Sequence, residues 1–414
     1  MDTNLDTELE KELEADFLEE DTDFLEEDGL GPESISPEEE DKEQLPPRTI
    51  YRATIGHYSW KKCLWGLDIG TQNVKVIGLR KSWSKWHLAY ISLVEIYPGR
   101  KASKQDVNEQ ARIAAVLNSM EELNLEGAKL NTCLDRASVL IRQIQYPAAA
   151  RDKILTALQW EVRKYIPFKP DEVVVDAQII GQNGAEDTND KKGQLDVLLV
   201  AATKEHLQQL NELLERVGVK PACIDAGPLA LMNMLLAQKP PNPDETFLIL
   251  DLGAAATTLN VLSAKGQYFT LSLSVGGNRF TNEIQTHCQL EYAIAEDLKR
   301  GKKLEDYLLS GNKLESAFHV AMEKNFELLV KEIRQALIYF HKQTGINQFS
   351  QLYLTGGGAY LTGLDAYLAQ KTGIKVEIFN PFDGIQIDPK HFDVELVRKL
   401  GPQMALALGL ASRE

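Results

Sequence analysis

The feature that most constrains the fold is a strand–turn–strand unit that occurs twice. The first copy, CLWGLDIGTQNVKVIGLR, begins at Cys63, and the second, TFLILDLGAAATTLNVLS, begins at Thr246. In each copy an apolar strand ends near an aspartate, a glycine stands two positions after it, and an apolar strand returns after a small, polar turn. A proline-rich hinge at 239–243 precedes the second copy. Because the duplicated unit alternates with helices, it predicts two related α/β lobes.

The remaining sequence alternates between strand and helix patterns. Further strands are expected at 86–96, 137–145, 173–180, 195–203 and 352–355, and helices at 106–123, 151–166, 204–216, within 283–344 and at 404–411. In the second of these helices Ile154, Leu158, Val162 and Ile166 recur every four residues. Gly345 is a plausible helix stop, Pro402 precedes the last helix, and a polar loop is expected at 181–193.

Each aspartate–x–glycine turn has the chemistry of a phosphate site. Gly70 and Gly253 let backbone N–H groups face inward as an anion cradle, and Asp68 and Asp251 can hold Mg²⁺ through water. Lys75, on the first return strand, offers a point charge to phosphates. Further hydroxyl and amide donors are Thr71, Gln72, Asn73 and Thr257. One such triplet alone is weak evidence, because many are ordinary turns at strand ends.

A third glycine turn, Gly356-Gly357-Gly358, lies between a predicted strand and a helical pattern. Glycines allow a flat ligand such as adenosine to lie against the backbone, and a flexible loop is the alternative. The chain has no G-x-x-x-x-G-K-[ST] and no G-x-S-x-G sequence, which argues against P-loop enzymes and serine hydrolases. Its seven histidines and four widely spaced cysteines show no metal-ligand spacing.

The net charge of −16 belongs to one end of the chain. Residues 1–50 contain 20 of the 61 acidic side chains and 3 of the 45 basic ones, so the rest is nearly neutral. A generally basic nucleic-acid surface is therefore not predicted. The N-terminus has no secretion-signal pattern, and the longest uncharged apolar window, 226–238, is shorter than the roughly 20 residues that cross a bilayer. We expect a cytoplasmic protein.

The acidic segment contains the hexapeptide DFLEED twice, at 16–21 and 23–28. Its composition predicts disorder, because it cannot bury enough apolar surface to offset its ordering entropy. The seven-residue period would place Phe17, Leu18, Phe24 and Leu25 on one side of a transient helix. Such a helix could dock in the groove of a partner. A solvated tail with no specific contact is the alternative.

The order of the three glycine turns resembles that of the actin-like ATPase family, which includes actin, the 70-kDa chaperones, sugar kinases and FtsA. GLDIGTQNVKV is similar to the family's first phosphate loop, ILDLGAAATTLNV to its second and YLTGGGAYLTGL to its adenosine loop. The resemblance spans residues 63–412. It implies an α/β, actin-like two-lobed fold with duplicated sheet-and-helix lobes.

Within that family the chain is most similar to the PilM proteins of type IV pilus assembly. The segments that carry this similarity are YPAAARDKILTALQWEVRKYIPFKPDEVVVDAQII, LLVAATKEHLQQLNELLERVGVKP, SVGGNRFTNEIQ, YAIAEDLKRG and VEIFNPFDGI. The resemblance implies the inserted subdomain of FtsA and PilM. The expected parts are a disordered acidic tail (1–58), the first lobe (59–140), the inserted subdomain (141–203), the first lobe and hinge helix (204–243), the second lobe (244–397) and a closing helix on the first lobe (398–414).

The resemblance also implies an ATP site between the lobes. Asp68 and Asp251 would hold water-coordinated Mg²⁺. Phosphate contacts would come from Gly70, Thr71, Gln72, Asn73 and Lys75 on one side and from Gly253 and Thr257 on the other. Gly277, Asn278, Glu296 and Lys299 would approach the phosphates and ribose. Gly356, Gly357, Gly358 and Ala359 would pack on the adenosine.

The chain departs from the family pattern at two places. The second loop reads DLGAAATT, where stronger hydrolases keep further glycine or acidic residues. The hinge helix that begins at Pro228 offers only Asn233 where actin-like enzymes orient a water molecule. A poorly oriented water slows hydrolysis, so we expect ATP binding with slow or no turnover and assign no catalytic residue.

The implied function is a cytoplasmic ATP-binding scaffold that is recruited to the inner membrane without inserting into it. Its implied partner is the cytoplasmic N-terminal segment of the inner-membrane protein PilN, held in a groove between subdomains, to which the helix at 151–166 could contribute. The scaffold would couple PilN to the cytoplasmic motor. The alternatives are an FtsA-like filament-forming ATPase and a type II secretion adaptor, with a sugar kinase as a weaker option. Whether the protein forms homo-oligomers or rings stays open.

Overall fold

The computed structural model describes residues 46–56, 60–83, 85–97, 109–121, 123, 125, 127–134, 138–183, 193–307 and 311–413. These residues belong to a unit that runs from Pro46 to Glu414. The DFLEED repeat and most of the loop expected at 181–193 lie outside the described residues. The predictions for those two segments therefore stay predictions.

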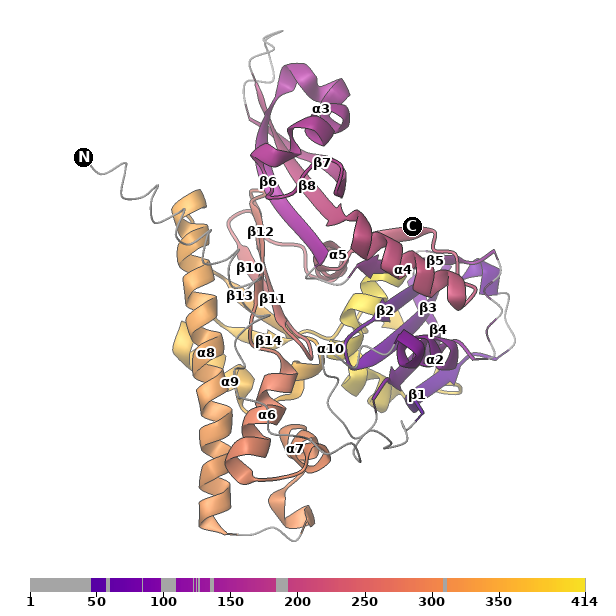
Figure 1. Ribbon diagram of the computed structural model, residues 1–414, viewed down its shortest axis with the longest axis vertical. Helices are drawn as coiled ribbons and strands as arrows, with labels where there is room; N and C mark the ends of the chain where they lie inside the picture. The colour runs from indigo at the N-terminus through magenta and orange to yellow at the C-terminus, as the bar shows by residue number, and fades with distance from the viewer. Residues whose placement is uncertain are drawn as a thin grey trace, which may run out of the picture. The chain divides into compact units, whose positions relative to one another are not determined.

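The first lobe is built on a sheet with strand order β1-β4-β3-β2-β5-β9, and β15 pairs with β4 (Figure 1). Its strands are β1 (Arg48–Thr54), β2 (Leu64–Ile69), β3 (Asn73–Ser82), β4 (Lys85–Glu95), β5 (Lys129–Leu134), β9 (Cys223–Ala226) and β15 (Ile385–Gln386). Strand β2 runs antiparallel to β3 and parallel to β5. Its apolar side chains Trp65 and Leu67 are fully buried, as expected for a central strand.

The second sheet repeats this arrangement with strand order β12-β11-β10-β13-β14. Its strands are β10 (Thr246–Leu252), β11 (Thr257–Ser263), β12 (Tyr268–Leu273), β13 (Gln351–Thr355) and β14 (Val376–Ile378). Strand β10 runs antiparallel to β11 and parallel to β13, so it has the same two kinds of neighbour as β2. The prediction of two lobes built on one plan is confirmed.

A third sheet of three strands, in the order β6-β8-β7, stands between β5 and β9 in the sequence. It contains β6 (Val139–Pro147), β7 (Val173–Asn183) and β8 (Gln194–Thr203). The helix expected at 151–166 is divided into η4 (Ala148–Lys153), α3 (Ile154–Glu161) and η5 (Val162–Lys164). Its predicted apolar stripe is nevertheless buried on this sheet, since Ile154, Leu158, Val162 and Ile166 are at most 8% exposed.

The helices surround the two larger sheets (Figure 1). They are α2 (Glu109–Ser119), α4 (Lys204–Arg216), α5 (Gly227–Gln238), α6 (Gly277–Cys288), α7 (Tyr292–Lys299), α8 (Asn312–Thr344), α9 (Leu364–Thr372) and α10 (Val394–Ala411), with the short turns η2 (Trp60–Lys62), η6 (Leu304–Tyr307) and η7 (Gly357–Tyr360). Gly345 ends α8 in the left-handed conformation, with φ of 74°, as predicted. Among the described residues, every helix is too short or too polar to cross a lipid bilayer.

Two boundaries differ from the sequence expectations. Residues 48–54, expected in the acidic tail, form β1, which pairs antiparallel with β4 and extends the first sheet. The chain also returns to the first lobe before residue 398, because Ile385 pairs with Trp86 of β4.

The closing helix differs as well, because α10 starts at Val394 and runs through Pro402. Proline lacks the N–H that would bond the carbonyl four residues earlier, at Arg398. Asn380 Nδ2 donates to that carbonyl at 3.0 Å and replaces the missing bond. A side chain from outside the helix therefore satisfies the backbone where the sequence predicts a helix start.

Candidate functional site

The two aspartate–x–glycine turns have the same geometry. Gly70 N donates to Asn73 O at 3.0 Å, and Gly253 N donates to Ala256 O at 3.0 Å. In both turns the aspartate stands near the carboxyl end of a central strand and is 6% exposed. The carboxyl ends of the parallel strands β10 and β13 also lie together, because Asp251 pairs with Thr355, just before the third glycine turn. We call these three turns, with the residues that contact them, the glycine-turn site.

Asp68 is neutralised by a residue of its own hairpin. Lys75 lies directly opposite it in the strand register, and its Nζ is 2.6 Å from Asp68 Oδ2. Next to them, Asn73 Oδ1 is buried and has no hydrogen-bond partner among the described residues. Thr71, at the tip of the turn, is exposed. This turn thus combines one carboxylate, one cation and one unsatisfied amide oxygen.

The second turn is bonded to the start of α6. Gly277 N donates to Gly253 O at 2.9 Å, and Asn278 N donates to Ala254 O at 2.8 Å. The sequence assigns Thr257 to the phosphates, but its hydroxyl donates to Val275 O and the residue is fully buried. The hydroxyl therefore serves the fold and is not directed at a phosphate.

A buried ion pair lies behind this turn. Lys299, 9% exposed, donates to Gly277 O at 3.1 Å, to Thr281 Oγ1 at 2.9 Å and to Glu296 Oε2 at 2.5 Å. Burial lowers the pKa of Lys299. Burial would raise the pKa of Glu296, but the charges of Lys299 and Arg300 outweigh it and hold that pKa below its usual value. The pair orders the start of α6 against the turn.

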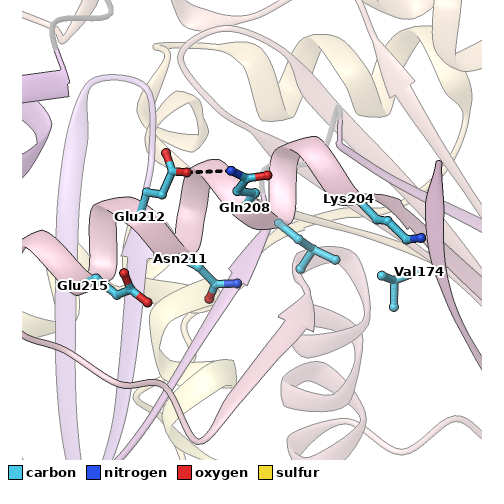
Figure 2. A pocket seen from close by; sticks show the side chains of 7 residues that line it. Val174, Lys204, Gln208, Asn211, Glu212 and Glu215 are labelled. Carbon is cyan, nitrogen blue, oxygen red and sulfur yellow. Dashed lines mark hydrogen bonds between the residues drawn. The ribbon is translucent and has the colours of Figure 1, made fainter. Parts of the chain in front are cut away.

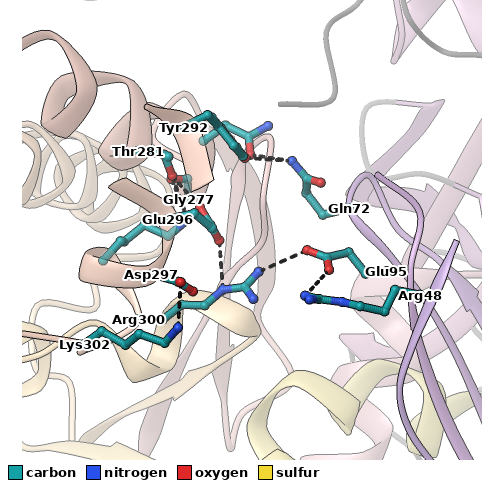
Figure 3. Close-up of polar contacts among 12 residues, drawn as sticks. Arg48, Gln72, Glu95, Gly277, Thr281, Tyr292, Glu296, Asp297, Arg300 and Lys302 are labelled. Carbon is teal, nitrogen blue, oxygen red and sulfur yellow. Dashed lines mark hydrogen bonds and ion pairs between the residues drawn. The ribbon is translucent and has the colours of Figure 1, made fainter. Parts of the chain in front are cut away.

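Two polar bridges join the lobes at this site, as Figure 3 shows. Gln72 of the first turn donates to Asn278 Oδ1 at 3.2 Å and to the Tyr292 hydroxyl at 3.1 Å. Glu95 at the end of β4 lies 3.9 Å from Arg300 and 2.6 Å from Arg48. Sequence reasoning finds Gln72 and Asn278 but misses Arg48, Glu95, Tyr292 and Arg300. No motif marks these four residues. Arg48 meets Glu95 only through the pairing of β1 with β4, and Tyr292 and Arg300 reach the first lobe only where the lobes pack together.

The third turn is packed tightly at two of its three glycines. A Cβ on Gly356 would lie 2.4 Å from Asp251 Oδ1, and one on Gly358 would lie 1.9 Å from Leu252 Cδ2. At Gly357 a Cβ would have no heavy atom within 4 Å. Gly357 is therefore the position of this turn whose backbone a flat ligand can approach. Ala359 is buried, and the next residue, Tyr360, has a buried hydroxyl without a partner among the described residues.

The hinge helix α5 supplies no acidic side chain. Asn233, the polar residue assigned there from the sequence, is exposed, whereas seven of its neighbours in the helix are buried. Among the described residues no group of three or more histidine, cysteine, aspartate or glutamate side chains could hold a metal ion. A cation at Asp68 and Asp251 would therefore need phosphate and water as its other ligands.

A second candidate surface lies between the inserted sheet and the first lobe. A hollow of about 490 Å³ is lined by one residue of β7 and one face of α4: Val174, Lys204, Leu207, Gln208, Asn211, Glu212 and Glu215. Figure 2 shows the polar side chains projecting from α4, with Gln208 bonded to Glu212 at 2.8 Å. Val174 is 48% exposed, so the hollow has an uncovered apolar side.

Comparison with known proteins gives a consistent result. A family model described as type IV pilus assembly protein PilM matches residues 66–414. A solved structure of the PilM-PilN type IV pilus biogenesis complex has a TM-score of 0.68 and 28% identity, and the match covers 84% of this chain and 97% of that chain.

Two more distant relatives match part of this chain. The cell division protein FtsA of Streptococcus pneumoniae serotype 2 (strain D39 / NCTC 7466) is 22% identical in a 351-residue alignment, and the match covers 76% of this chain and 75% of FtsA. The cell shape-determining protein MreB of Escherichia coli (strain K12) is 25% identical in a 210-residue alignment, and the match covers 43% of this chain and 58% of MreB.

Proposed function

The chain belongs to the PilM family of type IV pilus assembly proteins and has their actin-like fold, and from this premise we propose that it is an ATP-binding scaffold that holds a PilN-like protein. The observation that carries the nucleotide proposal is the pair of equivalent turns, each with a nearly buried aspartate at a strand end. The observation that carries the partner proposal is the similarity to a chain solved in a PilM-PilN complex.

The proposed ATP would lie at the glycine-turn site. Gly70, Gln72, Asn73 and Lys75 would contact its phosphates from the first lobe, and Gly253, Gly277 and Asn278 from the second. Mg²⁺ would be held by Asp68 and Asp251 through water and would neutralise the phosphate charge. The unsatisfied Asn73 Oδ1 supports this assignment, because a metal-bound water could donate to it. Gly357 would face the adenosine.

We propose that turnover is slow or absent. Water attack needs a group that orients the water and accepts its proton. Helix α5 carries no carboxylate, and its exposed Asn233 is a poor base. The nucleotide would then act as a conformational ligand that favours one arrangement of the lobes. Purified protein should hydrolyse ATP far below the usual enzyme range of roughly 1–1,000 per second, and turnover within that range would refute the proposal.

Alanine at two neighbouring glycines should separate ligand contact from packing. Gly357→Ala should leave the free energy of unfolding within about 0.5 kcal/mol of the wild type, because its Cβ meets open space. The same substitution should weaken ATP binding about tenfold. Gly358→Ala should destabilise the protein by roughly 1–3 kcal/mol, because its Cβ overlaps Leu252. Denaturant titration and calorimetry with Mg-ATP measure the two effects. Unchanged ATP affinity in Gly357→Ala would exclude adenosine from this turn.

For the partner, we propose that the hollow between β7 and α4 receives the N-terminal segment of the PilN-like protein. It lies between the inserted sheet and the first lobe, where the family resemblance implies a groove, and it offers both an apolar side chain and amide partners. Its lining comes from β7 and α4, and among the described residues none of it comes from the helix at 151–166, which the sequence indicates as a possible contributor to the groove. An extended peptide could use these amides for backbone hydrogen bonds.

A charged side chain placed in this hollow should weaken binding of the peptide. Val174→Glu should reduce affinity about tenfold or more, because a carboxylate would be desolvated beside Glu212 and Glu215. The matched control is Ile180→Glu, which changes another exposed residue of β7 outside the hollow. Fluorescence anisotropy with a labelled peptide measures both variants. If the two variants bind equally well, the peptide lies elsewhere.

Coupling to the motor and recruitment to the inner membrane from the cytoplasm follow from the same proposal. An ATP-dependent filament former like FtsA, or a type II secretion adaptor, remains the alternative. Sedimentation of the purified protein with Mg-ATP separates the filament former from the two adaptor functions, since a scaffold stays in solution and a filament former pellets.

A further inference from the structure

The hairpin between β3 and β4 ends in a tryptophan that the fold does not use. Trp83 is 98% exposed, and it has a left-handed backbone with φ of 56°. Because Ser82 pairs with Lys85, the connection has two residues, and such turns favour asparagine or glycine at positions with positive φ. A bulky side chain there strains the backbone and buries nothing in return. Such a local conflict points to a role outside folding.

Basic side chains gather at the same end of the first sheet. The tip itself carries Arg80, Lys81 and Lys85. Leu64, at the start of β2, pairs with Leu79 of β3 and with Lys129 of β5, so β2 and β5 both begin at this end. The exposed residues Lys61 and Lys62, just before β2, therefore lie at this end too. Lys81 Nζ lies 5.2 Å from the centre of the Trp86 ring. Asp383, which precedes β15, is acidic, but the basic side chains outnumber it among these described residues, so positive charge dominates.

We propose that this basic tip, formed by Lys61, Lys62, Arg80, Lys81, Trp83, Lys85 and Lys129, binds an anionic phospholipid surface, with the Trp83 indole in the headgroup region. Tryptophan is enriched at the membrane–water interface, and lysine and arginine are attracted to anionic headgroups. A single-stranded nucleic acid would instead need a groove with several stacked aromatic rings, whereas this tip presents one fully exposed indole. The contact is peripheral and requires no membrane-spanning helix.

The basic tip and the glycine-turn site lie at opposite ends of the same strands. Strand β4 runs from Lys85 at the tip to Glu95 at the site, about 33 Å at roughly 3.3 Å per residue. A membrane at the tip would therefore leave nucleotide binding unobstructed. The lipid contact is independent of the proposed function, so each can fail without the other.

Vesicle flotation of the full chain tests this inference. Vesicles of phosphatidylcholine alone are compared with vesicles that also contain phosphatidylglycerol. The wild type should float only with the anionic vesicles, and added salt should release it. Trp83→Asn should bind about tenfold more weakly, because burial of the indole is lost. Lys85→Glu should bind at least about fivefold more weakly.

Two controls keep the test decisive. Trp160→Asn removes a tryptophan that is 79% exposed on α3, outside the tip, and should bind like the wild type. Trp83→Asn should unfold at the same or a higher temperature than the wild type, because asparagine suits a positive φ. Equal flotation of the wild type with both vesicle types would overturn the inference. So would undiminished binding of Trp83→Asn, or tighter binding of a single-stranded oligonucleotide that the same substitution abolishes.

Discussion

Asp68→Ala is expected to weaken Mg-ATP binding at least about 100-fold, which corresponds to roughly 2.7 kcal/mol. The proposed site has two carboxylates for the metal, Asp68 and Asp251, and losing one removes a charged hydrogen-bond acceptor from a nearly buried position. The substitution also leaves Lys75 without its partner at 2.6 Å. Calorimetric titration of Mg-ATP into the two proteins measures the difference.

The matched control for this prediction is the same titration in EDTA. Without the metal, Asp68 repels the phosphates, so the variant should bind ATP at least as tightly as the wild type. Asp68→Asn keeps the size of the side chain and should behave like alanine, because the charge is what the metal requires. Retention of Mg-ATP affinity in both variants would contradict the assignment of Asp68.

Glu296→Ala is expected to destabilise the second lobe by about 3 kcal/mol. Lys299 is 9% exposed and donates to Glu296 at 2.5 Å, so the substitution leaves a buried cation without its counterion. Asp297→Asn is the matched control on the same helix. The Asp297 partner, Lys302, has a side chain that is 55% exposed, so losing that pair should cost less than about 1 kcal/mol. Denaturant titration measures both variants.

The pH dependence of this effect has a definite sign. In the wild type the pKa of Glu296 is lowered, so its stabilisation is present above the unfolded value of about 4.3 and is lost as the pH falls through the folded value. The penalty of Glu296→Ala should therefore be largest above the Glu296 transition, where the wild type keeps its ion pair and the variant buries Lys299, whose pKa is lowered, without a counterion. The penalty should shrink as the pH rises towards the unfolded value of about 10.4. A penalty independent of pH would mean that lost packing, and not the buried charge, causes the destabilisation.

Much of the fold is predictable because it repeats or is periodic. The two strand–turn–strand units give the two lobes, and the four-residue spacing from Ile154 to Ile166 gives a buried stripe even where the helix is interrupted. Strand β1 is missed because its pairing with β4 comes from a distant segment. The start of α10 is missed because the bond from Asn380 that tolerates Pro402 is a tertiary contact.

The residues of the candidate site likewise include some that a local sequence pattern predicts and some that depend on tertiary contacts. Residues within one hairpin, such as Asp68 with Lys75, are predictable from the turn and are close in the structure. Gly277 comes from the family resemblance, and its N–H bonds Gly253 of the second turn. The assignment of Thr257 depends on where one hydroxyl points, and packing turns it to Val275. The pairing of Glu95 with Arg300 exists only between lobes, so no local pattern marks it.

The central claim, a PilM-family scaffold that holds a PilN-like protein, is tested most directly by calorimetry. The cytoplasmic N-terminal peptide of the PilN-like protein from the same organism is titrated into the full chain saturated with Mg-ATP. The account predicts saturable binding with one peptide per chain, and the loss of that binding in Val174→Glu but not in Ile180→Glu. No heat of binding to a wild-type protein that is folded and loaded with ATP would contradict it.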